Sequence, residues 1–397
     1  MDEKTKKVTT TIIVVVVIIA IVAGVLGYYY SKPSGPSGGG TIKIGFFAPL
    51  TGEAAADGHS ALHGAQIAVD YINSHGGVLG KKLELVYYDD QLSPDQAIAI
   101  AHKLIEEDKV VAAVSGSYSS TTLAACSIYN EEGIPLVNSY AVNPDITRDK
   151  PYVFRVGMMG ETEGKAAGYA AVHYFHAKKI AILYIDNPFG VSLFNNAKSE
   201  TESLGASVVY SAKFKYPTTD FTPWLTEIKN QNPDVLIIFG YYPHAVAVKQ
   251  ARDLGITVPI LGAEGFDSPK FMEIAKDYAN GVVIVTDLNR DSNNSLVQYF
   301  LNKYQEIAGM PADMVGASAF DAVLVLAKAI EKAGSTDPGK ITNALKSLTN
   351  IEGATGKLLR FTDGGNVVKY LTLQEVKNLE FHFYAEITDP EIITPSF

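Results

Sequence analysis

The stretch VSGSYSSTTLAACSIYNEEGIPLVNSYAVNP, residues 114–144, decides the fold of this chain. The apolar, β-branched run 110–114 that leads into it is typical of a buried strand. Hydroxyl side chains then crowd the start of a helix, and a short strand at 134–137 leads into a polar turn at 138–143. This order of strand, turn, helix, strand and turn indicates a parallel α/β sheet with both turns at its carboxyl edge.

The two turns carry donors that suit an anion. Hydroxyl groups and the free N–H groups of a helix N-terminus form a ready anion site, and ligands of open α/β sheets bind at the carboxyl edge. We therefore predict one wall of a cleft that grips a small anionic group. The candidate ligand-binding residues of this wall are Ser117, Ser119, Ser120, Tyr140, Ala141 and Val142.

Outward from this stretch, strand and helix patterns alternate in two series. The first begins with the strand 42–46 and the helix 58–74, and the second runs from the helix 163–176 to the strand 282–285. A chain of 397 residues is long enough for two lobes with separate cores. We expect an α/β protein built from two doubly wound lobes.

In a two-lobed arrangement, three turns at strand ends of the second series would face the wall formed by residues 114–144. Phe189 follows one strand, Tyr241 follows another and Glu264 follows a third. Donors on one side and a carboxylate with a tyrosine on the other side suit a zwitterion.

Composition excludes several classes of function. The net charge is −10 and there is no basic patch, so no nucleic-acid partner is expected. The only cysteine, Cys126, allows neither an intrachain disulfide nor a cysteine-based metal cluster. No G-x-G-x-x-G follows the first strand, and no complete catalytic constellation is apparent. We expect no enzyme activity, no cofactor and no metal.

The N-terminus predicts a location at the cell membrane. Lysines occur within residues 1–7, and residues 8–30 carry no charge over a helical length of about 34 Å, enough for a bilayer core. The positive charge predicts a cytoplasmic stub at 1–7, a single-pass transmembrane anchor at 8–30 and an extracytoplasmic binding domain. The Gly/Ser/Pro linker 31–40 would tether that domain. A cleaved signal peptide is the alternative.

Residues 41–386 resemble the substrate-binding proteins of branched-chain amino acid ABC transporters, the Leu/Ile/Val-binding family with the type I periplasmic-binding fold. The resemblance depends on many short motifs in the expected order and spacing. They are Ile42–Gly45, Pro49–Gly52, Ile72–Asn73, Gly76–Gly77, Gly80–Leu85, Asp89–Asp90, Gly133–Pro135, Asn143–Pro144, Phe154–Arg155, Gln250–Arg252 and Ala333–Ser335.

The resemblance implies two lobes that are joined by three crossovers and close on the ligand like a hinged clamp. It implies that lobe 1 comprises 41–158 and 287–361, and that lobe 2 comprises 159–286 and 362–397.

The resemblance also implies roles for individual residues. Ser119 matches the serine that holds the ligand carboxylate, and Ala141 lies in the turn whose backbone shares that grip. Tyr241 matches the cleft tyrosine of lobe 2. Glu264 matches the acid that pairs with the ligand ammonium.

Three positions depart from the family pattern. Val142 stands where a threonine is frequent, and Phe189 stands where a tyrosine is common, so two hydroxyls are lost. Asp57 replaces a cleft aromatic, which indicates a ligand more polar than leucine.

The expected function is capture of a branched-chain or other aliphatic amino acid and its delivery to an ABC permease. Another amino acid, an amide or a urea-like solute is the alternative ligand. A ligand-sensing receptor ectodomain is the alternative function.

Overall fold

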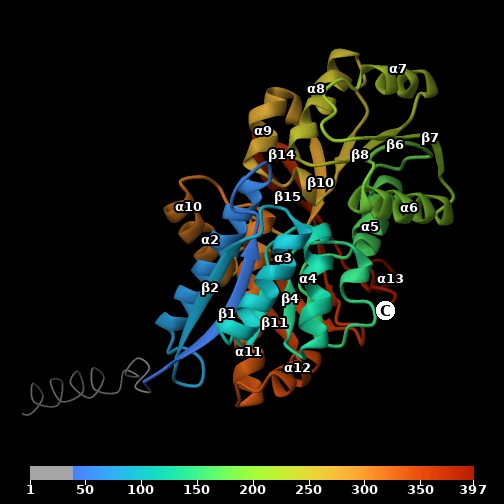
Figure 1. The fold of residues 1–397 in the computed structure, drawn as a ribbon. Helices are drawn as coiled ribbons and strands as arrows, with labels where there is room; N and C mark the ends of the chain where they lie inside the picture. Colours follow the sequence, from blue (N-terminus) through green and yellow to red (C-terminus); the bar gives the residue numbers. More distant parts are fainter. Residues whose placement is uncertain (1–38) are drawn as a thin grey trace, which may run out of the picture.

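The computed structural model describes residues 39–397. They form two α/β lobes (Figure 1), as the sequence predicts. The predicted stub, the anchor 8–30 and most of the linker lie outside the described residues. Among the residues that are described, no helix has the length and apolar character needed to cross a bilayer.

Lobe 1 is a parallel five-stranded sheet in the order β2-β1-β3-β4-β5, with helices on both faces. Its strands are β1 (Thr41–Ala48), β2 (Lys82–Asp89), β3 (Ala112–Ser115), β4 (Leu136–Asn138) and β5 (Val153–Arg155). Its helices are α2 (Ala55–Ser74), α3 (Pro94–His102), α4 (Ser119–Glu131), α10 (Ser295–Ala308), α11 (Met314–Ala333) and α12 (Pro338–Lys346).

Alternate side chains of β1 point to opposite faces of the sheet, and helices cover both faces. Phe46 joins the core on the side of α2 and α11, whereas Phe47 joins the core on the side of α3 and α4. The helices α2 and α11 pack closely because Gly64 lets the backbones approach, since a Cβ there would lie 1.9 Å from the Gly316 carbonyl oxygen.

Lobe 2 is a seven-stranded sheet in the order β15-β14-β10-β9-β8-β6-β7, with β14 and β15 antiparallel to their neighbours. Its strands are β6 (Lys179–Ile185), β7 (Ser207–Phe214), β8 (Val235–Phe239), β9 (Ile260–Gly262), β10 (Val282–Thr286), β14 (Leu371–Lys377) and β15 (Glu380–Ile387). Its helices are α5 (Gly160–His173), α6 (Pro188–Ser203), α7 (Thr222–Gln231), α8 (Ala245–Asp253), α9 (Pro269–Ala275) and α13 (Pro390–Ile393).

The chain crosses between the lobes three times. Val156 packs in the core of lobe 1 and Met158 in that of lobe 2, and the return crossing lies between Val285 and Leu288. The third crossing occurs within β13 (Val367–Lys369), where Val367 faces the lobe 1 core and Val368 faces the lobe 2 core. Residues 362–367, assigned to lobe 2 from the sequence, thus stay with lobe 1.

A small antiparallel sheet of β11 (Thr349–Gly353), β12 (Gly356–Phe361) and β13 completes lobe 1. It carries the buried Lys369, whose ammonium lies 2.9 Å from the Asp287 carboxylate of the second crossover. A further ion pair joins Arg290, which follows that crossover, to Asp267 of lobe 2. We call these two pairs the hinge ion pairs.

Candidate functional site

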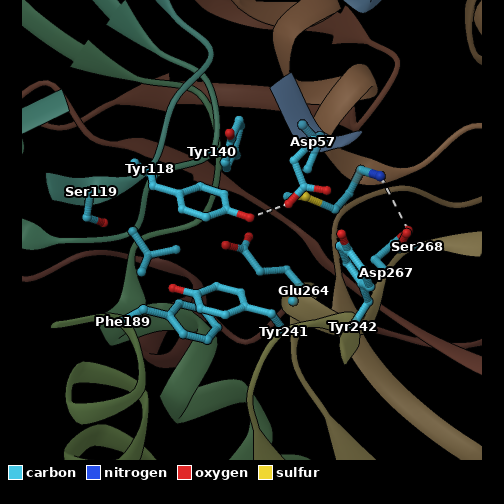
Figure 2. A pocket seen from close by; sticks show the side chains of 15 residues that line it. Asp57, Tyr118, Ser119, Tyr140, Phe189, Tyr241, Tyr242, Glu264, Asp267 and Ser268 are labelled. Atoms are coloured by element: carbon cyan, nitrogen blue, oxygen red, sulfur yellow. Dashed lines mark hydrogen bonds between the residues drawn. The ribbon is translucent and has the colours of Figure 1, made fainter. Parts of the chain in front are cut away.

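Two adjoining cavities lie between the lobes, where the carboxyl ends of both sheets meet. The inner cavity encloses about 50 Å³ and the outer cavity about 270 Å³. The inner cavity is lined by Asp57, Tyr118, Ser119, Tyr140, Ala141, Val142, Phe189, Tyr241, Tyr242, Glu264, Gly265, Asp267, Ser268, Met314 and Val315 (Figure 2).

Most of the residues predicted from the sequence therefore meet at the inner cavity. Two do not. Ser120 lines only the outer cavity, and Ser117 lines neither. The Ser117 hydroxyl is fully buried and lies 2.6 Å from the Thr121 hydroxyl, which closes the turn from inside. The Ser117 hydroxyl is therefore used in a buried side-chain contact within the turn and does not reach either cavity.

Ser119 ties the two turns of the lobe 1 wall together. It is the first residue of α4, and its hydroxyl oxygen accepts a hydrogen bond of 3.3 Å from the Asn143 N–H. The hydroxyl proton remains available to an anion in the cavity, beside the free N–H groups of the first turn of α4.

The second turn is held by its own side chains. The Asn138 amide accepts from the Ala141 N–H at 3.1 Å and donates to the Ala141 carbonyl at 2.6 Å. Ala141 therefore lines the cavity while its own N–H and carbonyl are already hydrogen-bonded, so any backbone donor of this turn comes from a neighbouring residue. The N–H groups of Tyr140 and Val142 make no hydrogen bond within the described residues, so this turn has two free backbone donors, one on each side of Ala141.

Arg155 lies behind the second turn and was not singled out as a site residue from the sequence. Its guanidinium is fully buried at the end of β5, and one nitrogen donates to the Asn143 carbonyl at 2.5 Å. Its other two nitrogens have no hydrogen-bond partner within the described residues. Burial lowers its pKa to about 9, which still leaves it charged at neutral pH, so it adds positive potential behind the wall.

The lobe 2 wall is built from the turns after β6, β8 and β9. The Tyr241 hydroxyl accepts a 3.1 Å hydrogen bond from the Asn187 amide, and the Tyr241 ring stacks on Phe189 with centroids 5.1 Å apart. Across the cleft, Tyr241 stacks on Tyr118 of lobe 1 with centroids 5.5 Å apart and planes inclined by 3°. Figure 2 shows these two rings facing each other across the cleft.

Glu264 brings a carboxylate to the inner cavity, and no basic side chain of residues 39–397 forms an ion pair with it. It is 8% exposed, and its Oε2 has no hydrogen-bond partner within the described residues. Burial raises the pKa of Glu264 well above its usual range, and the nearby Glu163 and Asp287 carboxylates raise it further. An ammonium group placed beside such a buried carboxylate would strongly stabilise its ionised form.

Glu163 supports Glu264 from the first turn of α5. Its Oε1 accepts a 2.7 Å hydrogen bond from the Glu264 N–H, while its Oε2 has no partner within the described residues. Burial raises the pKa of Glu163 to about 8, against the opposing effect of that hydrogen bond. Nothing in the local sequence marks this contact, because it joins residues 101 positions apart.

Other lining residues were also missed from the sequence. Tyr118 precedes Ser119 in the same hydroxyl-rich turn, and Tyr242 follows Tyr241, so their positions in the predicted turns were an available signal. Met314 and Val315 begin a long apolar helix and look like ordinary core residues. Only the packing of α11 brings them to the cavity.

The two walls of the site present complementary groups. Donors of the lobe 1 wall, with Arg155 behind them, face the Glu264 carboxylate of the lobe 2 wall. Among residues 39–397, no group of three or more His, Cys, Asp or Glu side chains is placed to hold a metal ion.

Comparison with known proteins agrees with this geometry. A relative from Pseudomonas aeruginosa, the leucine-, isoleucine-, valine-, threonine- and alanine-binding protein, is 32% identical over 87% of this chain and 89% of its own length. The branched-chain amino acid transporter substrate binding protein of Streptococcus pneumoniae, solved with isoleucine, superposes with a TM-score of 0.79. It is 27% identical over 88% of this chain and 99% of its own.

The same fold also occurs with other ligands. A solute binding protein of an ABC transporter from Rhodopseudomonas palustris, solved with 3,4-dihydroxybenzoic acid, has a TM-score of 0.79 at 22% identity over 88% of this chain and 99% of its own. The profile of the periplasmic binding protein family matches residues 41–380. The chain thus belongs to the periplasmic binding protein family, as its two lobes and the cleft between them indicate.

Proposed function

We propose that this protein captures an α-amino acid between its lobes and delivers it to the permease of an ABC transporter. The single observation that carries the proposal is the buried Glu264 carboxylate, which has no ion-pair partner in the described part of the chain and faces a wall of anion donors. An amino acid carries a group for each wall. Its ammonium would pair with the Glu264 carboxylate, and its carboxylate would accept hydrogen bonds from the Ser119 hydroxyl and the Val142 N–H. The named ligands of the Pseudomonas and Streptococcus relatives support this class of ligand.

The mechanism follows from the division of the site between the lobes. Because each lobe holds one end of the zwitterion, the ligand stabilises the closed arrangement by its differential affinity for that state. The permease then distinguishes the closed, loaded protein from the open one. The anchor at 8–30 would keep the protein at the outer face of the membrane, close to the permease.

A thermal-shift screen of the full-length chain tests the proposal. Each amino acid is added singly at high concentration, with the matching amine and the matching carboxylic acid as controls. A ligand at about 100 times its Kd stabilises the native state by about 2.7 kcal/mol, and only the intact amino acid should do so. Stabilisation by the acid alone, or by benzoates and by no amino acid, would contradict the proposal.

Delivery to a permease is tested separately. Deletion of the gene should abolish uptake of the amino acid identified in the screen. Intact uptake would contradict the transport part of the proposal and favour a receptor ectodomain.

A further inference from the structure

One end of the inner cavity is formed by Asp57, in the first turn of α2. The helix start is pressed against the end of β1, because Gly58 has no side chain and a Cβ there would lie 1.9 Å from the Pro49 carbonyl oxygen. This close approach fixes where Asp57 stands at the cleft. In the view of Figure 2, Asp57 and Ser119 lie at opposite ends of the site and Glu264 lies between them.

Asp57 does not serve the helix that carries it. An acid in the first turn can accept from free N–H groups of its own helix. The carboxylate of Asp57 instead accepts a 2.5 Å hydrogen bond from the Tyr118 hydroxyl, and its other oxygen has no hydrogen-bond partner within the described residues.

Other aspartates of lobe 1 have partners from the main chain. Asp89 accepts from the Leu50 N–H, Asp313 from the Gly316 N–H and Asp321 from the Ala354 N–H. Asp57 has no such partner and no cation in the described part of the chain. Burial raises the pKa of Asp57 to about 6, which reflects the cost of placing this carboxylate in the cavity with one hydrogen bond.

We propose that Asp57 selects the ligand side chain, and that the ligand is an amino acid whose side chain carries a hydrogen-bond donor, either a hydroxyl or an ammonium. The inference rests on the proposed function, because the amino and carboxyl groups must first be held by Glu264 and Ser119. The side chain then points to the end of the cavity that Asp57, Met314 and Val315 form.

The physical reason is the cost of dehydrating Asp57. A purely aliphatic side chain would remove water from the free carboxylate oxygen and offer nothing in return. A hydroxyl or an ammonium would replace that water with a charge-assisted hydrogen bond. The rings of Tyr118 and Tyr140 in the same lining also tolerate a cation near their faces.

Matched ligand pairs test the inference on the unmodified full-length chain by isothermal titration calorimetry. Threonine and valine have the same shape and differ by one hydroxyl, and ornithine and norvaline differ by a terminal ammonium. A hydrogen bond to a charged acceptor corresponds to about 10-fold to 100-fold in affinity. We expect one polar member to exceed its apolar partner by that factor, and the pair that responds identifies the donor as hydroxyl or ammonium.

Variants assign the preference to Asp57. Asp57→Leu should reverse the preference within the responding pair, and Tyr118→Phe should keep it because the Asp57 carboxylate remains. Asp95→Asn is the matched control, since Asp95 also lies in the first turn of a helix, α3, but is exposed away from the cleft.

Each outcome separates the two proposals. Valine and norvaline binding as tightly as threonine and ornithine would overturn the role of Asp57 and leave the amino-acid function standing. Binding of no amino acid would overturn the proposed function itself. A polar preference that persists in Asp57→Leu would also overturn the assignment to Asp57, whereas its loss there and retention in Asp95→Asn would support it.

Discussion

The hinge and the cleft bury carboxylates to a similar degree but treat their charges differently. At the hinge, Asp287 is paired with Lys369 and Asp267 with Arg290, and these acids are almost fully buried. In the cleft, Glu163 and Glu264 are also buried, and neither forms an ion pair with a basic side chain among residues 39–397. The fold thus gives its buried acids cationic partners where the lobes are connected and leaves Glu163 and Glu264 without such partners at the cavity between the lobes.

The largest effect is expected at the hinge. Lys369→Met should lower the free energy of unfolding by about 3–5 kcal/mol, because it leaves Asp287 buried without a cation. Urea denaturation of the full-length chain measures this. The double variant Lys369→Met/Asp287→Leu should recover much of the loss.

An exposed ion pair provides the control for that experiment. Lys198→Met breaks the surface pair with Glu202 and should cost less than about 0.5 kcal/mol. If Lys369→Met is as mild as Lys198→Met, the hinge pairs do not hold the crossovers together and the contrast with the cleft fails.

The cleft should respond in the opposite way. Glu264→Gln should weaken amino-acid binding by about 2–5 kcal/mol, since it removes the charge that faces the ammonium. It should not lower the stability of the ligand-free protein, because the removed charge has no partner to lose. Calorimetric titration and urea denaturation measure the two properties.

Glu273→Gln is the same chemical change on the exposed surface of α9 and should leave binding unaltered. Unchanged affinity in Glu264→Gln would mean that the ligand is not held through an ammonium group.

Ser119→Ala should have a smaller effect on the other end of the ligand. Loss of one hydroxyl donor, together with looser anchoring of the Asn143 N–H, should weaken binding by about 1–3 kcal/mol. Ser120→Ala, one residue further and lining only the outer cavity, should change affinity little. Equal losses in both variants would place the ligand carboxylate in the outer cavity.

The last effect is a pH dependence of stability, which is small when expressed as the change per pH unit. The pKa of Glu163 is raised by burial to about 8, so the folded state keeps its proton while the unfolded state releases it above a pH of about 4.5. Stability should therefore fall as pH rises from about 4.5 to 8, by at most about 1.4 kcal/mol per pH unit for this group.

Glu163→Gln should flatten this slope, and denaturation midpoints of the ligand-free protein at several pH values measure it. A slope that is the same in both proteins would show that Glu163 ionises normally, and the cleft would then resemble the hinge in balancing its charges.

Local patterns in the sequence determined a large part of this structure. Alternating strand and helix periods predicted both lobes, and turn chemistry placed Ser119, Tyr241 and Glu264 at strand ends that face one cleft. Strand ends are predictable in this way because parallel strands bring their carboxyl ends to one edge. The family motifs added the three crossovers, although the third lies within β13, beyond the predicted boundary.

The tertiary structure alone decided how the polar groups near the cleft are divided. Ser117 and Ser119 are two residues apart in one turn, yet the Ser117 hydroxyl is buried against Thr121 whereas Ser119 lines the inner cavity. The Ala141 N–H donates a hydrogen bond to the Asn138 side chain, and the Tyr118 ring stacks on Tyr241 of the other lobe. Met314, from a helix distant in sequence, lines the same cavity. These outcomes depend on side-chain direction and on packing between segments far apart in sequence, whereas periodicity and turn chemistry act only between near neighbours.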